Sequence, residues 1–176
     1  MARYCIRSGN LFAVEDDRPA VRLEFLKLSP LGNRKRVFAA DGRMELETNI
    51  EMTGQGTSLR NRRYTMTDPQ GGVLAIGSPE YEESDDPDIV GWSIYRVPCV
   101  DHVLIKGPNS DFSLRMLNSQ NYRLLDAKGK IVFELIHHGL CGGWNIEAED
   151  CFEPKMLLGF FIFCRYLEQE NEFVTV

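Results

Sequence analysis

The sequence predicts a mainly β protein in which short antiparallel strands surround one hydrophobic helix near the C-terminus. Three observations lead to this fold class: apolar and polar residues alternate in several short segments, turn sequences recur between them, and one uninterrupted apolar run follows. The chain has 176 residues, of which 43% are hydrophobic. That length and composition predict one domain, spanning 1–176, with a substantial core.

The strands are predicted from alternation. Residues 21–25, 44–47 and 112–116 each place apolar side chains at every second position, with charged or polar side chains between them. Successive side chains of a strand point to opposite faces, so each segment is expected to have one buried face. Residues 78–88, SPEYEESDDPD, combine proline with a run of acids and are predicted to form a solvated loop.

Two segments repeat the same turn chemistry. YTMTDPQGGVLA and YRLLDAKGKIVF match Tyr with Tyr, Asp with Asp and Gly with Gly, and FAADGRMEL is a shorter third instance. Asp68 and Asp126 are expected to bond the backbone of their turns, and Gly71 and Gly129 lie where a positive φ is often required. Each segment is therefore predicted to be a β-hairpin.

The apolar run from Met156 to Cys164 is predicted to be a buried helix. Nine helical residues rise only about 14 Å, whereas a membrane span needs about 20 apolar residues. Pro154 suits a first helical turn and Arg165 a last one. Because the apolar side chains would point to every side of the helix, protein must surround it, and no transmembrane segment is expected.

The order of these features resembles the tubby C-terminal-like superfamily. Hairpins with D-x-x-G turns, then GGWNIEAED, then a hydrophobic helix are similar to the LURP-one-related branch and, more distantly, to phospholipid scramblases. The resemblance implies a closed antiparallel barrel of about twelve strands around the C-terminal helix. It also implies an association with lipid head groups, although no tubby head-group motif maps onto this sequence. The scramblase cysteine cluster is missing, so scrambling activity is not carried over.

Composition and the first residues of the sequence argue against some classes of protein. A net charge of -6 and a pI near 5.1 argue against generic nucleic-acid binding. The first residues, MARYCIRSGNLFAV, lack the apolar segment of a secretory signal, so we expect a cytoplasmic protein, peripheral at a membrane if it binds one. Five scattered cysteines are expected to stay reduced.

Two basic clusters are the candidate ligand site. Arginine forks suit phosphate oxygens, and each cluster is expected just before a strand. The sequence therefore predicts a non-catalytic binding module for an anionic phospholipid head group, a membrane surface or a protein partner. The alternative for the clusters is a solvated surface that balances the acidic loop. The candidate residues are Arg34, Lys35, Arg36, Arg60, Arg62 and Arg63.

The alternative function is a small metal- or thiol-dependent hydrolase with a site near His137, His138 and Cys141. The spacing matches no standard zinc module. Adjacent histidines on a strand point to opposite faces, and the following glycines are typical of a turn before a strand at Trp144. Ordinary hairpin residues explain the segment better, so we expect neither a catalytic residue nor a metal or other cofactor.

Overall fold

The computed structural model describes residues 1–14, 19–25, 33–53, 61–81, 100–108, 110–118, 120–139 and 142–171, with the backbone alone at 19–25. In this part of the chain one helix follows twelve strands. The strands are β1 (Ala2–Arg7), β2 (Asn10–Ala13), β3 (Pro19–Phe25), β4 (Lys35–Ala39), β5 (Met44–Met52), β6 (Arg62–Thr67), β7 (Val73–Tyr81), β8 (Val100–Lys106), β9 (Asp111–Asn118), β10 (Asn121–Asp126), β11 (Ile131–His137) and β12 (Trp144–Ala148). The helix is α1 (Pro154–Asn171).

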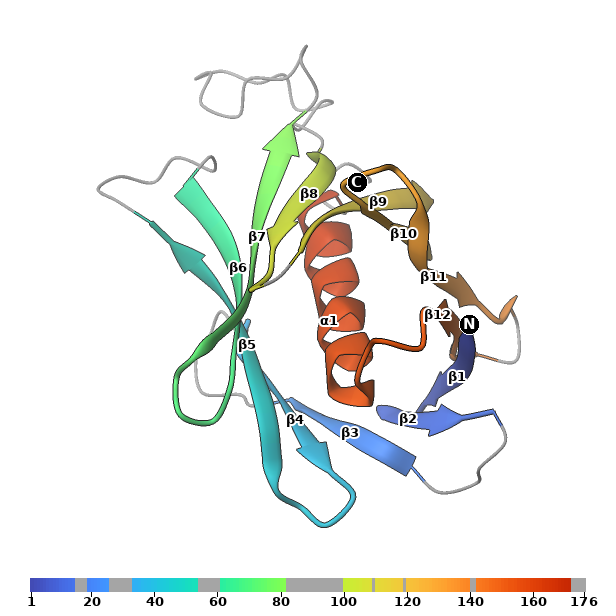
Figure 1. Ribbon diagram of the computed structural model, residues 1–176. Coiled ribbons are helices and arrows are strands. Elements are labelled where there is room, and N and C mark those ends of the chain that lie inside the picture. The colour runs from blue at the N-terminus through green and yellow to red at the C-terminus, as the bar shows by residue number, and fades with distance from the viewer. Residues whose placement is uncertain are drawn as a thin grey trace.

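All strand pairs are antiparallel, and each strand pairs with its neighbours in sequence. β1 also pairs with β12, from Ala2 opposite Ala148 to Ile6 opposite Trp144, so the strand order closes into a barrel. Figure 1 shows the strands arranged around the red helix. The predicted mainly β fold with a C-terminal helix is confirmed.

The helix occupies the interior of this sheet. Every residue from Leu157 to Cys164 is buried, and the predicted start at Pro154 is confirmed. The Phe163 ring contacts Tyr64 of β6 edge to face, with 5.6 Å between ring centroids, and the Phe160 ring contacts Phe133 of β11 in the same way at 6.1 Å. β6 and β11 lie on different sides of the barrel, so the helix is held from several directions (Figure 1). Among the described residues, no helix has the length and apolar character to cross a membrane.

One helical glycine permits close packing against β6. A Cβ atom at Gly159 would lie 2.5 Å from Met66 Cε and 2.8 Å from Met66 Sδ. Only a residue without a side chain therefore leaves Met66, which is fully buried, its present position against the helix.

The repeated turn sequences form equivalent hairpins. In β6–β7 the Asp68 carboxylate accepts hydrogen bonds from two backbone amides of its turn, and Asp126 does the same in β10–β11. Gly71 and Gly129 have φ values of 86° and 79°, as predicted. The register also shifts by one residue beside the turn in both hairpins and in β4–β5. The similarity of the segments therefore extends to a shared β-bulge.

Two predictions of local structure were wrong in part. Ser78 to Tyr81 belong to strand β7, because their backbone pairs with β8; the rest of the predicted acidic loop lies outside the described residues. β4 and β6 begin within the basic clusters rather than after them.

The packing of α1 predicts a large effect of Phe163→Ala. Phe163 is fully buried, and truncating such a ring typically lowers the free energy of unfolding by about 3 to 5 kcal/mol. Gln169→Ala, at an exposed position of the same helix, is expected to change it by less than about 0.5 kcal/mol. Urea denaturation of both variants measures the difference, and equal losses would contradict an enclosed helix.

Thiol reactivity gives a second prediction. Cys5, Cys151 and Cys164 are free thiols, whereas Cys99 and Cys141 lie outside the described residues. Cys151 is exposed, but Cys164 is fully buried and its burial raises the pKa of the thiol well above the usual range. Brief alkylation of the native protein, followed by peptide mass spectrometry, is expected to label Cys151 and leave Cys164 unmodified until denaturant is added. Rapid labelling of Cys164 in the native protein would contradict this structure.

Candidate functional site

The two basic clusters lie at the same end of the barrel, on either side of β5. Lys35, at the start of β4, is opposite Thr48 of β5, and Arg63, at the start of β6, is opposite Glu51. Those two positions are three residue steps apart on β5, which is about 10 Å along the strand, and two strand spacings add about 10 Å across it. The clusters are therefore close, although the strand between them carries acidic residues.

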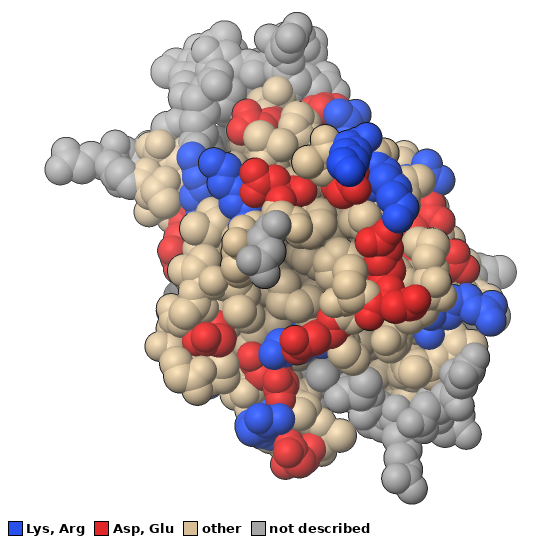
Figure 2. All heavy atoms as spheres, in the orientation of Figure 1, with Lys and Arg blue, Asp and Glu red and all other residues tan. Residues whose placement is uncertain are grey.

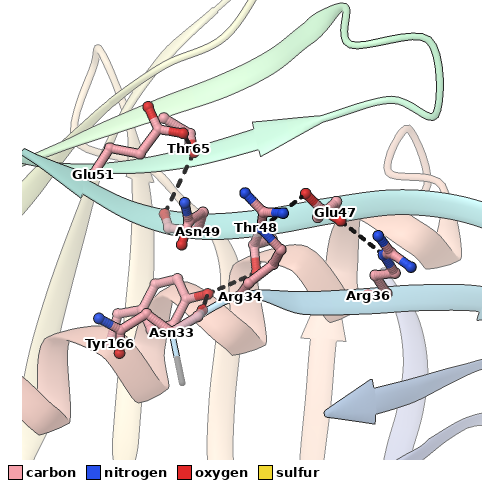
Figure 3. Close-up of polar contacts among 9 residues, drawn as sticks. All are labelled: Asn33, Arg34, Arg36, Glu47, Thr48, Asn49, Glu51, Thr65 and Tyr166. Carbon is pink, nitrogen blue, oxygen red and sulfur yellow. Dashed lines mark hydrogen bonds and ion pairs between the residues drawn. The ribbon is translucent and has the colours of Figure 1, made fainter. Parts of the chain in front are cut away.

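The outward-facing arginines of the first cluster are bound to a carboxylate. Arg34 and Arg36 both approach Glu47 of β5, with Nε to carboxylate oxygen distances of 3.3 Å and 2.7 Å (Figure 3). On the face drawn in Figure 2, Lys and Arg side chains likewise lie beside Asp and Glu rather than in one continuous basic patch. These arginines thus form part of a charge-balanced surface.

The second cluster is also engaged within the protein. Arg62 faces inward and forms an ion pair with Glu170 of α1, and Arg63 donates a 2.7 Å hydrogen bond to the Arg62 carbonyl oxygen. Burial raises the pKa of Glu170 above its ordinary value, although Arg62 opposes that shift. Arg60 lies outside the described residues.

Lys35 differs from its two neighbours because it faces the helix. Its Nζ atom lies 4.2 Å from the centre of the Tyr166 ring. Tyr166 is itself fixed: its hydroxyl donates to the Asn33 carbonyl oxygen and shares a 2.9 Å hydrogen bond with Thr48 (Figure 3). Burial, and then the positive charge of Arg165, lower the pKa of Lys35 to about 8.

Lys35 and Arg165 line the same cavity of about 490 Å³, between the C-terminal half of α1 and the barrel wall. The guanidinium carbon of Arg165 lies 5.5 Å from the centre of the Trp144 ring, and Arg165 pairs with Glu168 one helical turn away. Trp144 Nε1 is buried and has no acceptor within the described part of the chain. The described lining residues are Ile6, Ser8, Gly9, Lys35, Gly143, Trp144, Phe161, Ile162, Arg165 and Gln169.

The chemistry of this lining favours an anion. Lys35, Arg165 and the Trp144 indole are hydrogen-bond donors without acceptor capacity, and none of the described lining residues is Asp or Glu. Sequence reasoning included Lys35 but missed Arg165 and Trp144. The alternation of strand residues could have separated inward Lys35 from outward Arg34 and Arg36, whereas Arg165 was interpreted only as a helix-end residue.

A larger cavity of about 870 Å³ surrounds the N-terminal part of α1 at the opposite end of the barrel. Its wall is mostly apolar, with Phe112, Phe152 and Phe160 in contact with one another. The charged residues of its lining are Asp111, Asp126, Lys128 and Glu149. Acids exceed bases there, so this cavity suits an anion less well than the one beside Lys35.

The structure does not bring together a hydrolase site in the described residues. His138 is exposed, while the His137 ring contacts Trp144 edge to face at 5.1 Å between centroids, so the two histidines face apart as predicted. Cys141 lies outside the described residues. No group of three His, Cys, Asp or Glu side chains suited to a metal occurs among those residues that the structure describes.

Comparisons of this chain with protein-family models, with curated proteins and with solved structures gave no match. The resemblance to the tubby C-terminal-like superfamily therefore stays a prediction. Function has to be inferred from the geometry of the chain itself.

The buried ion pair predicts how stability depends on pH. Because the pKa of Glu170 is raised in the folded protein, the folded state binds this proton more tightly than the unfolded state, and stability falls as pH rises through the raised pKa. Glu170→Gln removes this loss. We expect the free energy of unfolding of the variant, minus that of the native protein, to increase between pH 4 and pH 7.

Arg62→Met supplies the matched control. Without the arginine, the attraction that opposes the Glu170 shift is lost, so the pH dependence is expected to steepen in the native background. In the Glu170→Gln background the same substitution should leave the slope unchanged. Denaturant titrations at several pH values measure both, and a variant curve parallel to the native one would show that Glu170 titrates normally.

Proposed function

We propose that this chain is a non-catalytic binding module that takes an anionic ligand, best matched by a phospholipid head group, in the cavity beside Lys35 and Arg165. The observation that carries the proposal is the meeting of two cations, from β4 and α1, at a cavity whose described lining contains no carboxylate side chain. A phosphate between them offsets their mutual repulsion, and the guanidinium supplies paired donors for its oxygens.

This proposal changes the roles of the predicted basic residues. Arg34, Arg36 and Arg62 already bind carboxylates of the protein, so each offers less net attraction to a second anion. Lys35 becomes the central residue of the predicted set because it lines the cavity, beside Arg165, whose own charge is partly offset by Glu168. Arg34, Arg36 and Arg62 then contribute mainly to the electrostatic potential around the cavity.

The wider setting follows from the same reasoning. The twelve paired strands around α1 support membership of the tubby C-terminal-like superfamily, close to its LURP-one-related branch. A head-group ligand would place the protein at the periphery of a membrane. A hydrolase at His137 and His138 has no comparable support, because their rings face apart.

Vesicle co-sedimentation tests the proposal. The native protein is expected to bind vesicles that contain phosphatidylserine, and Lys35→Met is expected to weaken binding about fivefold, the effect of roughly 1 kcal/mol for one basic residue at such a surface. Arg36→Met, on the outer face of the same strand, is the matched control and should change the affinity by less than twofold. Absence of binding to anionic vesicles at low salt would refute the proposal.

Binding measured at several pH values tests the contribution of Lys35. The pKa of Lys35 is about 8, so the charged form that attracts an anion is lost between pH 7 and pH 9, whereas Arg165 stays charged. Binding is therefore expected to weaken over this interval in the native protein and to stay nearly constant in Lys35→Met. Equal pH dependence in the two proteins would exclude Lys35 as the titrating contact.

A further inference from the structure

The cavity of about 870 Å³ at the N-terminal end of α1 has an accessible apolar wall. Leu74 of β7, Phe112 of β9, and Phe152 and Met156 at the start of α1 line it and are partly exposed rather than buried. Phe160 lies buried behind them, with its ring centroid 6.0 Å from that of Phe112 and 5.6 Å from that of Phe152. The wall therefore offers solvent-accessible apolar surface to a ligand, on a rigid support.

The charged residues of this cavity leave an excess of negative charge. Glu149 forms an ion pair with Lys130, which offsets its charge. Asp126 accepts hydrogen bonds from the backbone amides of Lys128 and Lys130, and these uncharged donors leave the charge of its carboxylate in place. Asp111 of β9 adds another carboxylate, whereas Lys128 is the one cation of the described lining. The chain as a whole carries a net charge of -6, so its wider field also favours a cation.

A ligand for this cavity has to match both features. A carboxylate or phosphate is repelled by the acidic rim, and a bare metal cation leaves the apolar wall without a partner. An organic cation buries its apolar body against the wall, and the faces of phenylalanine rings attract positive charge. The cavity volume of about 870 Å³ lies within the range of about 300 to 1,000 Å³ that is usual for small-molecule sites.

We infer that this cavity binds an arylalkyl- or alkylammonium ion, with the ammonium group near Asp111 and Asp126 and the apolar body against Leu74, Phe152 and Met156. The inference is independent of the proposed function, because this cavity and the one that Lys35 lines are at opposite ends of the barrel. The chain then carries two ligand sites that prefer opposite charges.

Isothermal titration of the native protein with four probes tests the inference, because the probes vary charge and ring separately. Phenethylammonium has both features, phenethyl alcohol lacks the charge, hydrocinnamate reverses it, and ethylammonium lacks the ring. One unit charge close to a carboxylate changes affinity about fivefold in water, so phenethyl alcohol is expected to bind about fivefold and hydrocinnamate about 25-fold more weakly than phenethylammonium. Ethylammonium is expected to bind at least about tenfold more weakly, because it buries no ring.

Three results of these titrations would overturn the inference. The first is equal affinity for phenethylammonium and hydrocinnamate, and the second is equal affinity for phenethylammonium and ethylammonium. The third is no binding of phenethylammonium at millimolar concentrations. None of them bears on vesicle binding through Lys35, so the proposed function stands or fails separately.

Alkylation of Cys151 locates the bound probe, because its exposed thiol lines the same cavity. Saturating phenethylammonium is expected to slow alkylation of Cys151 several-fold. Cys5 is partly exposed and lines a different cavity, formed by β1, β2 and β12, so its rate should not change. Protection of neither thiol, or equal protection of both, would place the probe elsewhere and overturn the inference.

A charge-removing pair of variants tests the ammonium contact. Asp126→Asn keeps a side-chain oxygen for the turn amides but removes the charge, and is expected to weaken phenethylammonium about fivefold while leaving phenethyl alcohol unchanged. Asp68→Asn makes the same change in the equivalent turn of β6–β7, outside the lining of this cavity, and is expected to have no measurable effect on either probe. Equal effects of the two substitutions would contradict the placement of the ammonium group.

A second pair tests the apolar wall. Met156→Ala removes accessible apolar surface and is expected to weaken phenethylammonium and phenethyl alcohol alike, by about threefold. Leu117→Ala truncates an exposed apolar side chain outside the cavity and should change neither affinity. Loss of affinity in Leu117→Ala, or none in Met156→Ala, would contradict the placement of the apolar body.

Discussion

The burial of α1 is the constraint on which the rest of the structure depends. A helix whose side chains from Leu157 to Cys164 are all buried cannot be stable in water, and the surrounding strands have inward faces that are equally apolar. The helix covers the apolar inward faces of the strands, and the strands cover the apolar side chains of the helix. The pairing of β1 with β12 completes the enclosure, because it removes the last two unpaired edges of the sheet.

The same burial creates the polar end of the barrel. The apolar run ends at Cys164, but the helix continues inside the sheet to Asn171, so polar side chains of its last turns have to be satisfied there. Tyr166 reaches Thr48 and Glu170 reaches Arg62, which ties the helix to β5 and β6. On the side of Lys35 and Trp144 the interior is less completely filled, and the cavity with its two cations results.

Much of the fold could be predicted because its signals are local. An Asp and a Gly at a fixed spacing specify a turn, and an apolar run with Pro154 at its start specifies a helix. The site could be predicted only in part, since its contacts join distant segments. Nothing near Arg62 in the sequence indicates Glu170, and Lys35 meets Arg165 only after β4 has packed on the helix. The alternating direction of side chains along a strand was the one available signal that could have distinguished inward Lys35 from outward Arg34 and Arg36.

The position of α1 after all twelve strands has a consequence for synthesis. A ribosome releases the strands before the helix that fills the space between them, so the inward faces of the strands have no apolar partner until translation of this segment is nearly finished. Pairing of the first strand with the last imposes a similar delay, and such distant contacts slow folding. The nascent chain must therefore carry exposed strand edges and apolar surface while it is being made, and these are the features that chaperones bind and that aggregation exploits.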